Sequence, residues 1–469
     1  MKDYQLAIFL FRRDLRLVDN TGLRQALEQA ERVLPLFILD PRQASTDNPY
    51  LAINGLRFMF NSLSELDQEL GKAGGRLYLL EGKAEEVIDR LLGGKSGPGV
   101  DAVFFNRDYT PFSRKRDQAL TRVCEKHNVA PHWSGDALLN EPETTLKSDG
   151  TPYTVFTPFF RRASQIAVPV PRALPRTGPK RWFQEPLKGA RHPADSANFF
   201  AKFTADNRAQ LFREGGRKEA RAILKRIADH KAYSERRDIP SEPGTTGLSA
   251  HMKFGTLSAR EFYHAAREAL GPEHALIRQL YWRDFFTQIA FYFPHVFGKA
   301  FRPVYDAVPW KRDKKTFAAW CQGRTGFPIV DAGMRELTAT GYMHNRVRMI
   351  TASFLTKDLH LDWRWGEKFF ARHLLDYDPA VNNGSWQWAA STGCDAQPYF
   401  RVFNPWLQQK KFDPDCVYIK RWIPELGQLE PKAIHKLNEN PLFRPADYPA
   451  PIVEHSVVAP AAKAMFKNL

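Results

Sequence analysis

The chain has 469 residues, which is too many for one ordinary hydrophobic core, so we expect two domains or more. It has no long apolar run, and its N-terminus, MKDYQLAIFLFRRDLRL, places charges directly after a short apolar stretch, so the sequence predicts neither a membrane span nor a signal peptide. Lys and Arg number 68 against 52 acidic residues, a formal charge of +16. This excess favours a polyanion such as nucleic acid as partner; the alternative is a merely soluble basic protein.

Cysteine usage indicates a reducing compartment. The four cysteines lie far apart and form no CxxC pair; they are Cys124, Cys321, Cys394 and Cys416. This spacing predicts neither a disulfide framework nor a metal site, and a cytoplasmic location fits it.

Residues 1–130 alternate between strand-like and helical patterns. Strands are expected at 6–11, 33–39, 76–80 and 102–105, with helices at 21–33, 55–75 and 84–92. Strands that alternate with helices predict an α/β domain with a doubly wound parallel sheet. No GxGxxG follows the first strand, so a dinucleotide-binding loop of that type is not supported there.

Residues 131–469 differ from this first part in composition and periodicity. Residues 131–200 are rich in Pro and show little periodicity, so we expect a long connector over the surface. Residues 201–469 carry helical periodicity, in stretches such as HALIRQLYWRDFFTQIAFYF, together with most of the tryptophans. This part is predicted to be an all-helical domain.

The stretch LLDYDPAVNNGSWQWAASTG at 374–393 combines acids, amides and indoles. Such side chains could surround a buried planar heterocycle, with Asp378 accepting from a ring N–H and Asn382 donating to a ring nitrogen. A buried Asp376 would need a cation, for which Arg346 and Arg348 are the nearest candidates. The alternative interpretation is an ordinary helix cap with core tryptophans.

A second cluster, GTTGLS at 244–249, places hydroxyl groups in a turn before a helix. Its hydroxyls and backbone N–H groups, with the helix dipole, could cradle phosphates. The alternative is a plain capping turn.

Together with these clusters, the segments FRRDLRLVDN, YWRDFF, TGFPIVDAGMREL and MHNRVRMITASFLTKDL resemble the photolyase and cryptochrome family in order and spacing, over nearly the whole chain. The resemblance implies an α/β antenna domain (1–130), a linker (131–200) and a helical domain (201–469) that holds FAD. A cytoplasmic monomer acting on damaged duplex or single-stranded DNA is the expectation.

The resemblance also implies roles near the flavin. Asp376 would pair with Arg348, Asp378 would lie near flavin N3–H, and Asn382 would face flavin N5. The other residues that the resemblance places in contact with the cofactor are Tyr233, Thr245, Thr246, Leu248, Ser249 and Asn345. Trp386, Trp363 and Trp310 match a relay that carries an electron from the surface to the excited flavin.

The substrate is predicted from the helix MHNRVRM. The (6-4) photoproduct enzymes carry two histidines where this chain has Asn345 and Met349, so the proton donor of (6-4) repair is missing. Trp282 matches the aromatic on which a flipped cyclobutane dimer stacks. Gln279 does not match this substrate assignment, because bacterial cyclobutane-dimer enzymes have a glutamate at that position. We predict light-driven repair of cyclobutane dimers, with (6-4) repair as the alternative.

Further DNA contacts are expected around the mouth of the pocket, from Arg237, Arg283, Arg346, Met349, Trp388 and Arg401. A signalling cryptochrome is the rival class, but only a short tail follows residue 450, and Asn382 replaces the acid of plant receptors. An iron–sulfur relative would need four clustered cysteines. The antenna pigment stays open: Phe112 and Ser113 replace the Asn-Glu pair of folate-binding relatives, so a deazaflavin or second flavin is as well supported as folate.

Overall fold

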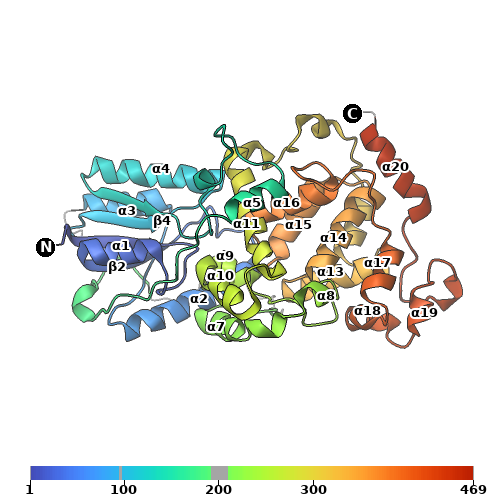
Figure 1. Cartoon of the computed structure of the whole chain (residues 1–469), viewed down its shortest axis with the longest axis horizontal. Coiled ribbons are helices and arrows are strands. Elements are labelled where there is room, and N and C mark those ends of the chain that lie inside the picture. The colour runs from blue at the N-terminus through green and yellow to red at the C-terminus, as the bar shows by residue number, and fades with distance from the viewer. Residues whose placement is uncertain (1, 95–97, 192–209, 468) are drawn as a thin grey trace.

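The computed structural model describes residues 2–94, 98–191, 210–467 and 469. An α/β part at the N-terminal end adjoins a larger helical part that carries the C-terminus (Figure 1). The predicted boundary between residues 200 and 201 lies outside the described residues, so the domain limits stay a prediction.

The N-terminal part is built on a five-stranded, all-parallel sheet with the order β3-β2-β1-β4-β5. The strands are β1 (Tyr4–Phe11), β2 (Ala30–Leu39), β3 (Tyr78–Glu81), β4 (Ala102–Asn106) and β5 (Ala130–Ser134). β2 begins three residues earlier than predicted, because Tyr4 of β1 pairs with Ala30 and Leu6 pairs with Arg32. The order of the strands reverses between β1 and β4, which defines the switch point of the sheet.

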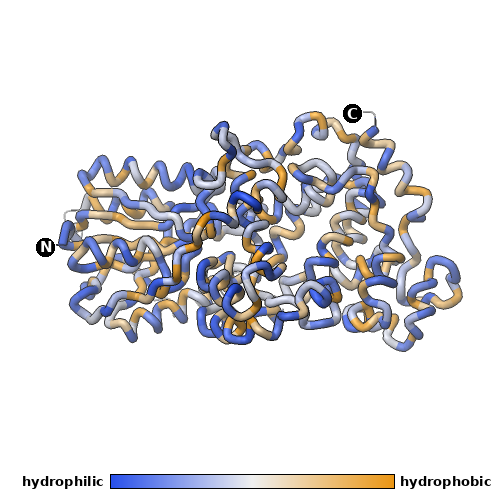
Figure 2. The backbone as a smooth tube through the Cα atoms, in the orientation of Figure 1, coloured by the Kyte–Doolittle hydropathy of each residue, from blue (hydrophilic) through white to orange (hydrophobic). Residues whose placement is uncertain are grey.

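Helices cover both faces of this sheet. Alternate residues of β1, namely Ala7, Phe9 and Phe11, pack with α1 (Thr21–Gln29) and α2 (Ile53–Lys72). The intervening residues Leu6, Ile8 and Leu10 pack with α3 (Ala84–Gly93) and α4 (Pro111–Lys126). The middle parts of β1, β2 and β4 are accordingly hydrophobic, whereas the helices alternate between hydrophobic and hydrophilic residues (Figure 2). The predicted doubly wound sheet is confirmed.

The second part is helical, as predicted. Its helices before the C-terminal third are α5 (Phe156–Ala163), α7 (Arg217–Lys225), α8 (Tyr233–Arg236), α9 (Ser249–Phe254), α10 (Ala259–Leu270), α11 (Ala275–Tyr292), α12 (Lys314–Cys321) and α13 (Pro328–Thr340). Those that follow are α14 (Asn345–Ser353), α15 (Trp363–His373), α16 (Pro379–Ala390), α17 (Pro405–Phe412), α18 (Val417–Trp422), α19 (Pro431–Ile434) and α20 (His455–Lys467). A π-helical turn, Phe354–Asp358, extends α14. Short 3₁₀ turns lie at Pro142–Thr144, Pro179–Arg181, Ile227–His230, Pro294–Val296, Pro303–Ala307, Pro424–Leu426 and Pro441–Phe443. Among the described residues, no helix combines the length and apolar character needed to cross a membrane.

Residues 131–191, the described part of the predicted surface connector, are more ordered and more buried than expected. This segment contributes most of β5, and α5 forms within it with Phe156 and Phe159 buried. Asp284 of α11 accepts hydrogen bonds from the backbone N–H groups of Leu139 and Asn140, at 2.9 and 3.1 Å. These tertiary contacts hold the segment, which is why periodicity alone did not predict its helix.

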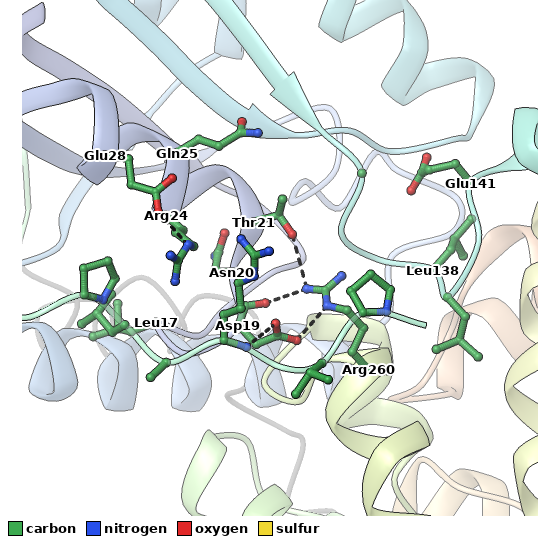
Figure 3. A pocket seen from close by; sticks show the side chains of 18 residues that line it. Leu17, Asp19, Asn20, Thr21, Arg24, Gln25, Glu28, Leu138, Glu141 and Arg260 are labelled. Atoms are coloured by element: carbon green, nitrogen blue, oxygen red, sulfur yellow. Dashed lines mark hydrogen bonds and ion pairs between the residues drawn. The ribbon is translucent and has the colours of Figure 1, made fainter. Parts of the chain in front are cut away.

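Buried ion pairs join the two parts. Arg260 of α10 reaches Asp19 (Nε–Oδ2 2.9 Å) and Asp136 (Nη2–Oδ1 2.8 Å), and Arg16 also pairs with Asp136 at 2.6 Å. Figure 3 shows Arg260 directed at Asp19 and Thr21 beside a cavity of about 400 Å³. The charged groups at this junction are therefore largely used to hold the two parts together.

Candidate flavin and DNA site

A buried ion pair marks the centre of the candidate site. Arg348 of α14 donates from Nη2 to Oδ2 of Asp376 at 3.0 Å, and from Nε to the carbonyl of Met343 at 2.7 Å. Burial lowers the pKa of Arg348, but Asp376, Tyr342 and Glu336 together outweigh burial, and the pKa lies above its ordinary value. The predicted partner of Asp376 is therefore observed.

The GTTGLS turn lies next to this pair. Thr245 hydrogen-bonds to Tyr342. Burial raises the pKa of Tyr342, while the nearby charge of Arg348 lowers it and that of Asp376 raises it. Tyr342 stacks on Phe212 with ring centroids 3.8 Å apart. The hydroxyl of Thr246 accepts from the backbone N–H of Leu248 at 3.3 Å. The turn thus meets the pair across Tyr342, although Ser249 is exposed and α9 has only six residues, which gives it a small dipole.

Polar atoms without partners surround the same place. Of the buried side-chain atoms that make no hydrogen bond among the described residues, four belong to residues near this pair; they are Asp376 Oδ1, His344 Nε2, Arg237 Nε and Arg346 Nε. Burial lowers the pKa of His344 to about 4, so its imidazole is neutral at pH 7. Its Nδ1 accepts from the backbone N–H of Arg346 at 3.3 Å, which leaves Nε2 as the donor. One acceptor and three donors fit a ligand that has both a ring N–H and anionic groups.

Two of the predicted cofactor-binding residues, Tyr233 and Asn345, differ in burial. Tyr233 of α8 is buried, with the guanidinium of Arg237 5.7 Å from its ring centroid. Asn345, the first residue of α14, is exposed, and its amide lies 3.8 Å from the sulfur of Met349. Their contact with a cofactor stays a prediction.

Asp378 has other partners than predicted. One oxygen caps α16 by accepting from the N–H groups of Ala380 and Val381, and the other pairs with Arg13 from the loop after β1. Burial would raise the pKa of Asp378, yet Arg13, with Lys253 and Arg283, holds it well below its ordinary value. Asp378 therefore joins the two parts of the chain. Its place near a ring N–H stays a prediction, and Asp376 Oδ1 is a second acceptor close by that has no partner among the described residues.

Asn382 lies on the buried side of α16. Its Nδ2 donates to the carbonyl of Glu367 at 3.2 Å, and the neighbouring Asn383 donates to the carboxyl of Glu367 at 3.2 Å. Burial raises the pKa of Glu367 to about 7. The bond from Asn382 orients its amide, and the two bonds together tie α16 to one residue of α15.

Of the three predicted relay tryptophans, two are buried and one is half-buried, and their role as a relay stays a prediction. A Cβ atom at Gly366 would lie 2.5 Å from Cζ3 of Trp386, so the Trp386 indole rests on α15 one turn after Trp363. Trp363 is fully buried. Trp310 is half-buried, and the next residue, Lys311, bridges to Leu361 near the start of α15. Trp320, which sequence analysis did not select, also packs on Trp386 at 6.2 Å.

Trp282 of α11 forms an aromatic platform at the other side of α16. Phe156 stacks flat on its indole, with centroids 3.6 Å apart and planes at 5°. Phe286 packs at 5.6 Å, and its ring lies directly on Gly384 of α16. The predicted base-stacking residue and the helix that carries Asn382 are therefore in contact through one ring.

The predicted DNA contacts divide into accessible and inaccessible side chains. Arg401 is exposed, and Gln279, Met349 and Trp388 are half-buried. Arg346 pairs with Asp238 at 2.8 Å. Arg283 points inward and donates to the carbonyls of Ala137 and Met252, at 2.5 and 3.4 Å, which argues against a DNA contact from it.

Sequence comparison identifies the family. The profile described as "DNA photolyase" matches residues 7–177, and that described as "FAD binding domain of DNA photolyase" matches residues 276–468. A deoxyribodipyrimidine photo-lyase of Alkalihalophilus pseudofirmus is 38% identical, over 98% of this chain and 97% of that protein. The chain belongs to the DNA photolyase family. The predicted resemblance, the fold class and FAD as cofactor are thereby confirmed.

Solved photolyase structures agree with this assignment. An archaeal photolyase from Sulfolobus tokodaii with two FAD molecules is 43% identical, with a TM-score of 0.88, and the match covers 99% of this chain and 100% of that one. A cryptochrome from Synechocystis is 28% identical, with a TM-score of 0.86 and 99% of each chain covered. The roles of single residues in this photolyase stay predictions.

Proposed function

We propose that this photolyase splits cyclobutane pyrimidine dimers in DNA with light. The observation that carries the proposal is the contact of the Trp282 platform with α16 through Phe286 and Gly384. A flipped base stacked on Trp282 would then lie beside the helix that carries Asn382. The curated relatives named deoxyribodipyrimidine photo-lyase support the same reaction.

The buried groups described above would hold FAD. Asp376 Oδ1 would accept from a ring N–H, the amide of Asn382 would lie at the ring edge, and the donors of Arg237, Arg346 and His344 would meet anionic groups. The chemistry that reduced FAD supplies when bound is light-driven transfer of one electron to the dimer, with its return after the ring opens. The chain itself orients Asn382 through its bond to the carbonyl of Glu367.

Substrate choice follows from α14. Asn345 is exposed and Met349 half-buried at the two positions where (6-4) enzymes have histidine, so no imidazole can protonate a (6-4) lesion there. Gln279, half-buried and three residues before Trp282, can still hydrogen-bond the edge of a thymine. A cryptochrome role has less support, since the cryptochrome neighbour is 28% identical and the archaeal photolyase 43%.

A second flavin is the antenna pigment that the sheet edge supports best. Arg12 lies over Phe105 at 4.3 Å, and Arg42 lies over Phe112 at 5.2 Å, at the carboxyl ends of the strands. Nη2 of Arg12 and Nη2 of Arg116 are buried and have no partner among the described residues. Guanidinium donors beside aromatic rings at a switch point suit a ring with a phosphate. Release and chromatography of bound pigments should give two flavins per chain, whereas folate would refute this choice.

The test of the reaction is illumination of purified, reduced protein with oligonucleotides that carry one cyclobutane dimer or one (6-4) photoproduct. We expect restored thymines from the dimer alone, scored by chromatography, and none in the dark. Restoration of the (6-4) lesion with the dimer untouched would reverse the assignment and give Gln279 the decisive weight.

A further inference from the structure

One face of Trp282 is already covered by protein. The ring of Phe156 lies parallel to the indole at 3.6 Å, the distance of direct stacking, and Phe156 is 1% exposed. Phe285 and Phe286 meet the indole at 84° and 32°, both about 5.6 to 5.7 Å away. A base can therefore stack only on the face opposite Phe156.

Phe156 is itself held in place from several directions. Its backbone N–H donates to Oδ2 of Asp395 at 3.0 Å, which ties α5 to the loop after α16. Phe160 stacks on its ring at 5.8 Å, and Phe285 meets it edge-on at 5.7 Å. A ring fixed in this way restricts rotation of the Trp282 indole before any ligand binds.

We propose that Phe156 is a positioning residue for lesion recognition: it presents one rigid face of Trp282 to the extruded dimer. This inference rests on the proposed function, because it takes Trp282 as the stacking surface. Holding the indole in its bound orientation in advance removes an entropic cost from dimer binding. Binding of undamaged DNA, which leaves no base on Trp282, does not draw on this contact.

The same helix supplies a matched control. Phe159 is 1% exposed like Phe156, and its ring packs on Phe285 at 5.3 Å. Shortening Phe159 removes a comparable volume from the same core cluster, and the stack on Trp282 stays in place. Any general loosening of α5 will therefore appear in both variants.

Arg278 supplies the contrasting contact. Its guanidinium lies 5.2 Å from the rings of both Phe156 and Phe160, its side chain is exposed, and it precedes Trp282 by one turn of α11. A cation at this edge attracts DNA phosphates whatever the bases are. Removing it should weaken damaged and undamaged DNA alike.

The experiment compares Phe156→Leu, Phe159→Leu and Arg278→Ala with the parent as full-length FAD-loaded proteins. Dark binding is measured with two oligonucleotides that differ only by one cyclobutane thymine dimer. Phe156→Leu should weaken dimer binding about threefold to tenfold, the range of one aromatic pair, and leave undamaged binding unchanged. Phe159→Leu should keep the parent's ratio of the two affinities, and Arg278→Ala should lower both affinities equally.

Repair kinetics give a second reading. Phe156→Leu should raise KM for the dimer, with kcat at fixed light close to the parent value. If Phe156→Leu does not fold, Phe156→Met keeps the volume without the ring and serves in its place. Parent-like discrimination in the Phe156 variant, or equal losses in the Phe156 and Phe159 variants, overturns the inference. A parent that neither discriminates nor repairs the dimer overturns the proposed function instead.

Discussion

Replacing Gly384 by Ala should uncouple DNA binding from repair. A Cβ atom at this position would lie 2.7 Å from Cγ and Cε1 of Phe286 and nearer still to Cδ1, whereas ordinary contacts begin at 3.4 Å. The ring, or the whole of α11 against α16, must therefore move by more than 0.7 Å, the difference between these two distances. Because Phe286 also packs on Trp282, this movement reaches the stacking platform.

The size of the effect follows from the displacement. A misplacement of about 1 Å can cost on the order of 10²-fold in rate, so we expect repair per bound dimer to fall by roughly 10- to 100-fold. Overpacking should also cost about 1–3 kcal/mol of stability. Dimer affinity should change much less, because the indole face stays available.

The assay measures dark affinity for a dimer-containing oligonucleotide, and repair yield at saturating DNA under fixed light. Gly71→Ala is the matched control, because its Cβ would meet nothing within 4 Å, and it should leave both quantities unchanged. Repair at the parent yield in Gly384→Ala would show that the contact between α11 and α16 does not set the geometry of electron transfer.

Three further predictions concern light, salt and pH. Trp386→Phe should strongly slow photoreduction of oxidised flavin with an external reductant, while repair by pre-reduced protein survives. Trp182→Phe, in the core of the α/β part, should leave both photoreduction and repair unchanged. The logarithm of the affinity for duplex DNA should fall with the logarithm of the salt concentration, with a slope of about 0.9 per neutralised phosphate. Arg401→Ala should reduce this slope by about one phosphate, whereas Lys115→Ala on α4 should leave the slope unchanged. Burial raises the pKa of Glu367 to about 7 in the folded protein, against about 4.5 in the unfolded chain. Glu367 therefore contributes its full stability below pH 4.5, and this contribution is lost as the pH rises through 7. Glu367→Gln should make the temperature of thermal unfolding less sensitive to pH across this window.

A buried carboxylate demands a cation, so sequence analysis proposed Arg346 or Arg348 as the partner of Asp376, and the family resemblance implied Arg348. The observed bond from Arg348, 28 residues away, satisfies that demand. Asp378 posed the same demand, but its partner Arg13 lies 365 residues away in the α/β part. A single sequence without the fold gives no reason to join these two positions.

Phe156 was missed for a different reason. Its segment is Pro-rich and too short for a helical period, so sequence analysis assigned it to a connector. Its helix and its stack on Trp282 both depend on packing against α11, which local propensity does not encode. The signal that was present is FTPFF, whose aromatic residues at 156, 159 and 160 are spaced to share one face of a helix.

Arg12 and Arg13 connect the two proposed pigment sites. Arg12 faces the sheet edge, where it pairs with Asp117 at 2.6 Å and lies over Phe105. Arg13 pairs with Asp108 of the α/β part at 3.2 Å and with Asp378 at the start of α16. Buried ion pairs add little net stability, because desolvation offsets their attraction, but breaking one is costly, so they fix geometry. Adjacent residues on one strand end thus hold the sheet edge and the flavin helix at a constant separation, which is what transfer of excitation from an antenna to a flavin requires of the protein.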